Sequence, residues 1–292
     1  MTINFKSYED FHRDIVAWER DLPEFDAVCG VPRSGMIPAA YIATRRNLRM
    51  VELCRLLNDP VNIIARSPLR GNNPVMREAR SFKNRLLIVG DTTSDKGVTF
   101  KNIREQLSNF EHDLDVTYAA AYKAEGSTLA DLSYETIPHP RMFGWNWFRH
   151  WNLRQSMVDC DGVLCEDWKG RPEVTEDPEF EEHVRNAKPL YIPDNPVQAV
   201  VTSRIEKYRE GTEKWLKRHG VRYNALVMHP AKTPEERRAM GDHAKRKAVT
   251  YAKGYKSKQT MLFIESDEKQ ARTIAKLAKK PVLCTDVMRM FY

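Results

Sequence analysis

The stretch SMVDCDGVLCED, residues 156–167, ends a short apolar run in two closely spaced carboxylates, Asp159 and Asp161, followed at once by Gly162. In an extended segment, residues two positions apart point to the same side, and glycine lets the backbone turn sharply after them. A carboxylate can attack phosphorus when an ion neutralises the phosphate and a second acid protonates the leaving oxygen. The stretch therefore predicts Asp159 as a nucleophile and Asp161 as the acid, beside Mg²⁺.

Similar apolar runs recur along the chain, and segments with helical spacing separate them. The runs lie near residues 26–31, 85–91, 116–122, 156–162, 197–204, 224–230, 260–267 and 280–287. The predicted helices lie near residues 35–46, 99–113, 211–220 and 267–280. Strands that alternate with helices favour parallel sheets with right-handed crossovers. We therefore expect an α/β protein with two doubly wound domains and mainly parallel sheets.

The alternation of predicted strands and helices is interrupted near residues 137–155, where two prolines and a group of aromatic residues precede the next strand. A chain of 292 residues suits two domains of the usual size, roughly 100–200 residues each. We place the first domain at residues 1–150 and the second at 151–292. The aromatic segment Phe143–Trp151 has two interpretations: a hood that stacks on a flat base, or packing between the domains.

Composition places the chain among globular proteins, with 41% hydrophobic and 30% charged residues. The five cysteines are scattered and odd in number, and no apolar stretch reaches the roughly 18 residues of a membrane span, so we expect a cytoplasmic protein. Most of the net charge of +7 comes from the second half, especially residues 204–258. This basic stretch either forms a solvated helical surface or attracts a negatively charged partner, such as a phosphorylated ligand or nucleic acid.

Three further motifs follow Asp161 in the second half. A strand ends in Thr202, the segment 244–253 contains Lys247, and a later strand ends in Glu265 with Asp267 close behind. In this order the motifs resemble the haloacid dehalogenase (HAD) superfamily of phosphatases, over about residues 156–292. About forty residues separate Asp161 from Thr202, too few for a large cap domain, so we expect an open site.

The HAD resemblance implies a role for each motif. Thr202 would bind the transferring phosphoryl group with its neighbours Ser203 and Arg204, and a lysine would balance the negative charge. Lys247 is the first choice for that lysine, with Lys253 and Lys256 as alternatives. The Mg²⁺ ligands would come from the four acids Asp159, Asp161, Glu265 and Asp267.

Two strand ends in the first half carry loops suited to anions. The first loop joins a strand to a helix through Val31, Pro32, Arg33, Ser34 and Gly35. Such a turn aims backbone N–H groups and a helix N-terminus at an anion, and Arg33 adds a positive charge. The second loop has an acid and several hydroxyls before a helix: Asp91, Thr92, Thr93, Ser94, Asp95, Lys96, Gly97, Val98 and Thr99.

These two loops resemble those of type I phosphoribosyltransferases, over about residues 20–150. The resemblance implies that the first loop binds diphosphate and that the second binds the ribose 5-phosphate of 5-phosphoribosyl 1-diphosphate, with Mg²⁺. Gly90 stands where the family usually has a second acid, and the second loop is one residue longer. The basic segment near residues 65–85, with Arg70, Arg77 and Arg80, is either the family's mobile loop or an ordinary basic loop.

Together the halves predict a bifunctional Mg²⁺-dependent enzyme. The first domain would transfer a phosphoribosyl group to a nucleobase-like acceptor, and the second would hydrolyse a phosphate ester through an aspartyl-phosphate, giving a nucleoside-like product. One alternative is a phosphatase regulated by a non-catalytic domain that binds phosphoribosyl diphosphate. Another is a nucleic-acid end-processing or binding protein, suggested by the basic stretch 204–258. The helix near residues 7–20 leaves open whether the chain forms oligomers.

Overall fold

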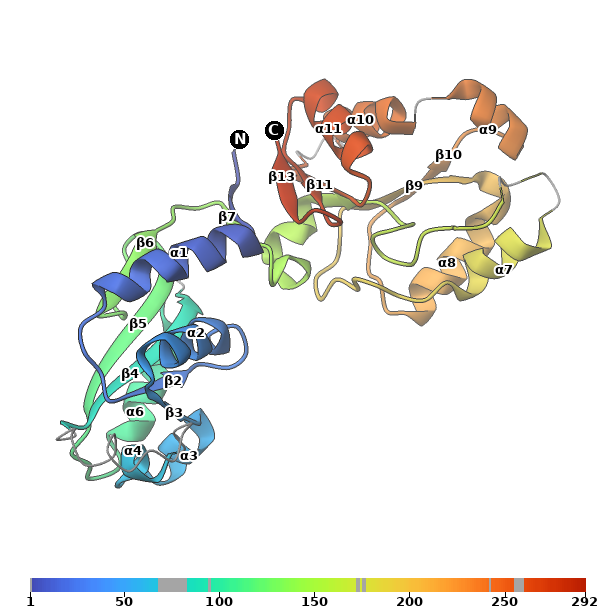
Figure 1. The fold of residues 1–292 in the computed structure, drawn as a ribbon. Helices are drawn as coiled ribbons and strands as arrows, with labels where there is room; N and C mark the ends of the chain where they lie inside the picture. Colours follow the sequence, from blue (N-terminus) through green and yellow to red (C-terminus); the bar gives the residue numbers. More distant parts are fainter. Residues whose placement is uncertain are drawn as a thin grey trace. The chain divides into compact units, whose positions relative to one another are not determined.

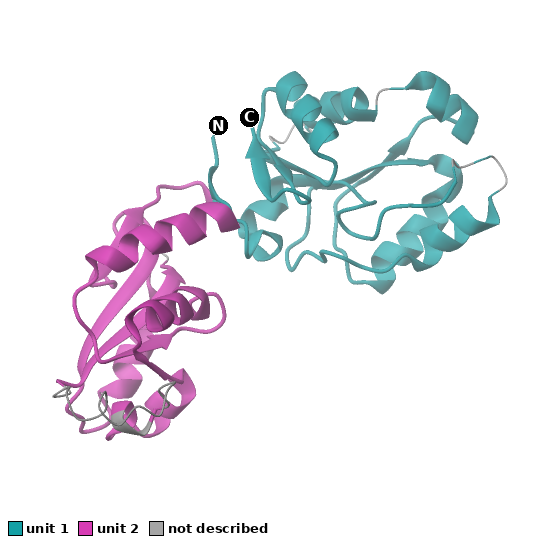
Figure 2. Ribbon diagram, viewed as in Figure 1, with its two compact units in different colours: residues 1–7, 142–292 teal, residues 8–141 magenta. Residues whose placement is uncertain are grey.

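Strands and helices alternate along the chain in the computed structural model, which describes residues 2–67, 83–93, 96–171, 174, 177–241, 243–254 and 260–292. The chain divides into two compact units (Figure 2). We call Tyr8–Arg141, drawn magenta in Figure 2, the first unit, and Met1–Ser7 with Met142–Tyr292, drawn teal, the second unit, following their order along most of the chain. Both units are mixed α/β with mostly parallel sheets, so the predicted fold class is confirmed.

The unit of residues 8–141 is built on a five-stranded parallel sheet in the order β3-β2-β4-β5-β6 (Figure 1). The strands are β2 (Ala27–Gly30), β3 (Arg49–Val51), β4 (Arg85–Thr92), β5 (Asp115–Lys123) and β6 (Leu132–Thr136). On one face, alternate strand residues such as Ile88 and Ala120 pack against α3 (Leu53–Asn58), α4 (Ile63–Arg66) and α6 (Val98–Leu107). The helices α1 (Tyr8–Asp21) and α2 (Met36–Arg46) belong to the same unit. In α1, Phe11 contacts the ring of Tyr122 in β5.

The other unit has a six-stranded sheet in the order β10-β9-β8-β11-β12-β13, in which only the pair β12–β13 is antiparallel. The strands are β8 (Ser156–Val158), β9 (Ala199–Ile205), β10 (Leu226–His229), β11 (Leu262–Glu265), β12 (Val282–Cys284) and β13 (Arg289–Phe291). Helices cover both faces, as expected for a doubly wound sheet.

The helices of this unit divide between the two faces of its sheet (Figure 1). The helices α10 (His243–Lys253) and α11 (Glu268–Ala278) share one apolar core with strand residues such as Phe263. The opposite core contains Trp215 of α8 (Arg209–Arg218) and strand residues such as Ile264. The remaining α-helices are α7 (Pro178–Asn186) and α9 (Pro234–Met240). Among the described residues between Asp161 and Thr202, α7 is the only α-helix, which agrees with the absence of a large cap.

The boundary was predicted between residues 150 and 151, but the two units divide between Arg141 and Met142, and residues 1–7 belong with the later part of the chain. The strand β1 (Asn4–Lys6) pairs with β7 (Arg141–Phe143), and Ile3 is fully buried in the core of the second unit. Trp147 lies in that same core and contacts Tyr191. Its buried ring therefore cannot stack on a base, and the hood interpretation is wrong for this residue.

The structure also bears on the expectations about the cysteines and about membrane-spanning segments. Four cysteines are buried and only Cys54 is exposed, all without disulfides. No helix in the described ranges is long and apolar enough to cross a membrane.

Candidate functional site

The acidic motifs of the second unit meet at one edge of its sheet. The strands β9, β8 and β11 are neighbours and run parallel, so their carboxyl ends lie together. Asp159 follows β8 and Glu265 ends β11. Thr202, predicted to end its strand, lies in the middle of β9, which continues to Ile205. The sequence places these three residues far apart, and the strand order brings them to a common site.

A buried lysine joins two of these acids. The Nζ of Lys247 lies 2.6 Å from Oδ2 of Asp159, 2.7 Å from Oε2 of Glu265 and 3.1 Å from Oε1 of Gln270. Lys247 is only 1% exposed. Burial alone would lower its pKa, but the charges of Asp159 and Glu265 outweigh burial and raise the pKa above its usual value. Burial, with the nearby Asp159, raises the pKa of the Glu265 carboxyl.

The choice among the three lysines follows from these contacts. Lys253 is exposed at the end of α10, and Lys256 lies outside the described residues. Lys247 alone of the two described candidates is buried against Asp159. The structure therefore places Lys247 at the position that the resemblance assigns to the charge-balancing lysine.

Asp161 is held by a second buried cation. The Nε of Arg204 donates to both oxygens of Asp161 at 3.2 and 3.0 Å, and Nη2 donates to Oδ1 at 2.6 Å. The Nε2 of His183 in α7 lies 3.4 Å from the same Oδ1. Burial alone would raise the pKa of Asp161, but the Arg204 charge and the bonds from His183 and Arg204 hold that pKa far below its usual range. In this arrangement Asp161 is an anion and Arg204 is its counterion.

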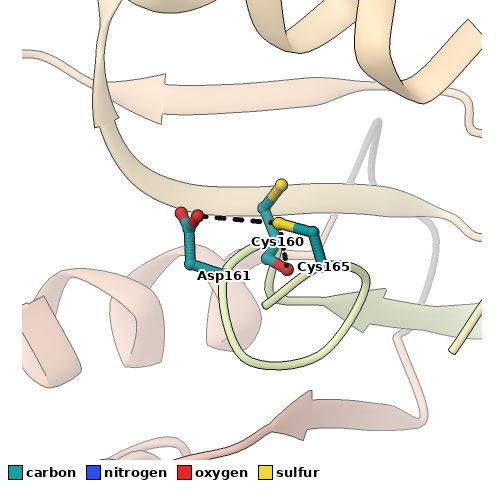
Figure 3. Close-up of side chains that lie close together, drawn as sticks. All are labelled: Cys160, Asp161 and Cys165. Carbon is teal, nitrogen blue, oxygen red and sulfur yellow. Dashed lines mark hydrogen bonds between the residues drawn. The ribbon is translucent and has the colours of Figure 1, made fainter. Parts of the chain in front are cut away.

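Two thiols lie beside this ion pair (Figure 3). The Sγ of Cys165 lies 3.7 Å from Oδ1 of Asp161 and 3.6 Å from the carbonyl oxygen of Cys160. Ligand atoms of Cys160, Asp161 and Cys165 lie within 4.8 Å of one another, a spacing that could suit a metal ion. However, Arg204 Nη2 lies 3.4 Å from the Cys165 sulfur. The hydrogen bond to Cys160 raises the pKa of the Cys165 thiol, and burial raises it further. A guanidinium and a protonated thiol disfavour a cation here.

Of the remaining predicted residues of this half, some line the cavity and one is buried away from it. Thr202 is fully buried, its Oγ1 accepts from the Arg204 amide at 3.1 Å, and it lies 3.5 Å from Oδ2 of Asp161. Asp267 is the N-cap of α11 and accepts from the Gln270 amide at 2.7 Å. Ser203 and Asp267 line the cavity described next, whereas Thr202 is not among its lining residues.

A cavity of about 420 Å³ opens above these groups. Its acidic lining residues are Asp159, Asp161, Asp167, Glu265 and Asp267. Its basic lining residues are Arg171, Arg204, Arg237, Arg238 and Lys247, with His243 beside them. Carboxylate oxygens are the protein ligands that Mg²⁺ prefers, and Asp159, Glu265 and Asp267 supply them to this lining. The Oδ2 of Asp159 and the Oε2 of Glu265 already contact Nζ of Lys247, so a bound ion would use the other oxygens of these acids.

Sequence reasoning missed several of these cavity residues. Trp168 lies between the predicted motifs, and Arg237 and Arg238 lie on α9, which no motif marked. His183, which contacts Asp161 without lining the cavity, was missed as well. The basic stretch 204–258 was the available signal for the two arginines, although it did not single them out.

The two loops of the first unit also meet. The strands β2 and β4 are parallel neighbours, so the loops after them lie at one edge of the sheet. A cavity of about 240 Å³ is lined by Val31, Pro32, Arg33, Ser34, Gly90, Asp91, Thr92, Thr93, Gly97, Val98, Thr99 and Phe100. Both following helices, α2 and α6, have a glycine as N-cap, Gly35 and Gly97, without a side-chain cap. In α2 the first two amides, those of Met36 and Ile37, already donate to the carbonyl oxygens of Arg33 and Ser34.

Some predicted residues of this half cannot be placed. Ser94 and Asp95 lie outside the described residues, as do Arg70, Arg77 and Arg80 of the basic segment. Lys96 is exposed and is not among the residues that line the cavity. The anion site is therefore defined by the first loop, by Asp91 to Thr93 and by Gly97 to Thr99.

Gly35→Ala should destabilise the first unit, because the new Cβ would lie 2.5 Å from the Val31 carbonyl oxygen and 2.7 Å from that of Val89. Backbone atoms cannot move aside cheaply, so we expect a loss of about 1–3 kcal/mol in the free energy of unfolding. Gly126→Ala is the control: nothing lies within 4 Å of its Cβ, and its positive φ should cost only about 1 kcal/mol. Urea unfolding measures both, and equal losses would contradict the close approach at Gly35.

Comparison with known proteins finds similarity over about half of the chain. No protein-family model matches. Xanthine-guanine phosphoribosyltransferase of Idiomarina loihiensis is 23% identical over 151 residues, which cover 50% of this chain and 89% of that relative. The N-terminal half is thus phosphoribosyltransferase-like, as its loops predict. The HAD resemblance of the second half stays a prediction.

Two solved structures match a similar share of the chain. The purine phosphoribosyltransferase from Pyrococcus horikoshii is 18% identical with a TM-score of 0.34, covering 50% of this chain and 94% of that one. The Helicobacter pylori xanthine-guanine-hypoxanthine phosphoribosyltransferase is 16% identical with a TM-score of 0.35, covering 49% and 93%.

Proposed function

We propose that the chain is a bifunctional Mg²⁺-dependent enzyme with one phosphate chemistry in each half. The first half transfers a phosphoribosyl group from 5-phosphoribosyl 1-diphosphate to a nucleobase-like acceptor. The second half hydrolyses a phosphate ester by the HAD mechanism, with Asp159 as nucleophile. When that ester is the nucleotide formed in the first half, the joint product is nucleoside-like.

One observation carries the second activity: Lys247 lies against both Asp159 and Glu265 in a cavity at the carboxyl edge of the sheet. Its ammonium group lies 2.6 Å from Oδ2 of Asp159, and a carboxylate can attack phosphorus only in its anionic form. Magnesium, held by Asp159 and Glu265, would neutralise the phosphate's negative charge when bound. Asp161 and its partner Arg204 line the same cavity.

The reaction has two steps in this scheme. An oxygen of Asp159 bonds to phosphorus, the bond from phosphorus to the ester oxygen breaks, and the departing oxygen takes a proton from a water molecule. Water then attacks the phosphorus of the aspartyl-phosphate, which releases orthophosphate and restores Asp159. The resemblance assigns the proton transfers to Asp161. Because Arg204 holds Asp161 as an anion, that residue is better prepared to accept a proton from water than to donate one.

The first activity is supported by the two loops that share a cavity and by the relative of known activity. The bond between ribose C1 and the diphosphate oxygen breaks, and C1 bonds to a ring nitrogen of the base. Because diphosphate departs with its charge, the guanidinium of Arg33, which lines the cavity, would stabilise the leaving group. Asp91, which also lines the cavity, would bind ribose hydroxyls.

One observation favours a non-catalytic first half that only senses phosphoribosyl diphosphate. A Cβ at Gly90 would lie 3.3 Å from Cζ of Phe100, so a carboxylate at this position would be crowded by that ring. The acid that type I phosphoribosyltransferases usually carry before Asp91 therefore has little room here. In this second candidate the first half binds its ligand and regulates the phosphatase.

Incubation with Mg²⁺, phosphoribosyl diphosphate and a pool of bases tests the proposal by mass spectrometry. We expect a new nucleotide or nucleoside together with diphosphate, and neither product when EDTA removes the metal. Phosphate release from nucleotides, measured separately, reports on the second half. Binding of phosphoribosyl diphosphate without diphosphate release would favour the sensor, and the absence of both activities would reject the bifunctional scheme.

A further inference from the structure

Two polar atoms in the cavity of the second unit have no hydrogen-bond partner in the part of the chain that the structure describes. They are Oγ of Ser203 and Nδ1 of His243, and both atoms are shielded from solvent. Both residues line the 420 Å³ cavity. Buried polar atoms are normally hydrogen-bonded, because an unpaired atom loses its solvation without return. A polar group of a ligand in the cavity would supply the missing partners.

The helix α10 places His243 one turn from the proposed chemistry. His243 and Lys247 are four positions apart in this helix, so their Cβ atoms lie about 5–6 Å apart on one face. Nζ of Lys247 lies 2.6 Å from Oδ2 of Asp159. Pockets that enclose whole small molecules measure about 300–1,000 Å³, and this cavity lies in that range. It therefore has room for the alcohol part of a phosphate ester, on the side of His243.

Ser203 is held close to α10 by an arginine of that helix. Nη2 of Arg246 donates to the carbonyl oxygen of Thr202 at 2.6 Å. Arg246 lies three positions after His243, and Thr202 directly precedes Ser203 in β9. The carbonyl oxygen of Ser203 accepts from Nη1 of Arg237 at 3.1 Å, so the backbone on both sides of the Ser203 side chain is held. The Ser203 hydroxyl therefore has a fixed place at the cavity.

The His243 ring is also fixed, and it is neutral. It meets the ring of His229 edge-on, with the ring centroids 5.8 Å apart. Burial lowers the pKa of His243, and the positive charges of Arg237, Lys247 and Arg246 lower it further. A neutral imidazole offers one N–H donor and one acceptor nitrogen, which suits an uncharged polar group.

A hydroxyl group matches these two atoms better than a phosphoryl oxygen does. A phosphoryl oxygen only accepts hydrogen bonds. A hydroxyl donates and accepts, so it pairs with Nδ1 of His243 whether or not that nitrogen carries the proton, and with the Ser203 hydroxyl in either direction. The scissile phosphoryl group has other partners, because Lys247 and Arg204 line the same cavity and Mg²⁺ would bind beside Asp159.

We propose that Ser203 and His243 bind hydroxyl groups on the alcohol part of the phosphatase substrate, and that these contacts determine which esters are hydrolysed. Sugar phosphates and nucleotides with a free ribose share this chemistry. The inference rests on the proposed phosphatase and specifies its substrate class. Hydrolysis follows the two steps given above, and the hydroxyl groups leave unchanged on the alcohol product. A phosphate ester without such hydroxyls is then a poorer substrate.

The test compares kcat/KM for two pairs of phosphate esters that differ in their hydroxyl groups. One pair is a ribonucleoside 5′-monophosphate and its 2′,3′-dideoxy analogue, and the other is ribose 5-phosphate and 2-deoxyribose 5-phosphate. We expect the ester with more hydroxyls to exceed its partner by about tenfold in the better pair, since a buried polar atom left unpaired weakens binding. The better pair shows whether the source is a nucleotide or a free sugar phosphate.

His243→Leu and Ser203→Ala should each reduce this preference, because each removes one of the two unpartnered atoms. His243→Asn keeps a hydrogen-bonding amide near the place of Nδ1 and should retain part of the preference. His219→Leu is the matched control. The ring of His219 packs on Trp215 with the centroids 4.4 Å apart, and His219 is not among the residues that line the cavity. Circular dichroism checks that each variant is folded.

The outcomes separate this inference from the phosphatase itself. A preference for hydroxyls that falls in His243→Leu and is partly kept in His243→Asn supports it. Equal kcat/KM within both pairs, or a preference that survives both His243→Leu and Ser203→Ala, would overturn it while leaving the phosphatase intact. An equal loss for all esters in His243→Leu would also overturn it, because the contact would then be to the phosphoryl group. Failure of the wild-type protein to hydrolyse any of the esters would reject both proposals together.

Discussion

Asp159→Asn is expected to abolish phosphate release by the second half while leaving the chain folded. An amide cannot act as the attacking anion, and loss of a covalent nucleophile typically lowers kcat by at least about 10⁴-fold. Lys247 keeps its contact with Glu265 at 2.7 Å, so folding should survive the change. Steady-state phosphate release and circular dichroism measure the two effects.

Asp194→Asn is the matched control for this substitution. The substitution removes one negative charge from the same half, as Asp159→Asn does. The Asp194 side chain is 56% exposed, and its oxygen lies 3.7 Å from Nε of Arg149. Its variant should keep the wild-type rate. If the Asp159 variant retained a rate near that of the control, Asp159 could not be the nucleophile.

Lys247→Met is expected to cause the largest loss of stability. The substitution leaves Asp159 and Glu265, which are 6% and 1% exposed, without the cation between them. Removing one partner of a buried ion pair costs about 3–5 kcal/mol, because the remaining charge is buried and uncompensated. Equilibrium unfolding in urea measures the free-energy difference.

Two further variants make the interpretation specific. Lys253→Met removes an exposed lysine from the same helix and should change the free energy of unfolding by less than about 0.5 kcal/mol. Glu265→Gln combined with Lys247→Met removes one buried negative charge and should recover part of the stability. If Lys247→Met cost no more than Lys253→Met, the central role of this ion pair would be wrong.

The positions of the acids could be predicted from the sequence because strand ends in a parallel sheet share one edge. Asp159, Asp161 and Glu265 each follow an apolar run, and the fold needs no further information to gather them. The same rule predicted that the loops after β2 and β4 meet. These features depend on local pattern and on a general property of the fold class.

The choice of Lys247 needed the buried face of a helix. Ala244, Ala248 and Tyr251 lie three before, one after and four after Lys247, and all three are buried with it. That apolar stripe was a usable signal, since Lys253 lies off it. Motif order alone leaves all three lysines as candidates.

Other features depend on tertiary distance and had no local signal. Arg204 and Asp161 are 43 positions apart, and only the adjacency of β8 and β9 brings them into contact. Ile3 packs in the core of the second unit although it begins the chain. The short strands β1, β7 and β13 have three residues each, too few to show a period-two pattern.

The most direct test asks where the phosphoryl group goes during turnover. The wild-type protein is mixed with Mg²⁺ and an excess of nucleoside monophosphates, quenched in acid, and digested for peptide mass mapping. We expect one phosphoryl group on the peptide that contains Asp159, and none in Asp159→Asn. Sustained phosphate release with that peptide unmodified, or with the phosphoryl group on another residue, would contradict an aspartyl-phosphate at Asp159.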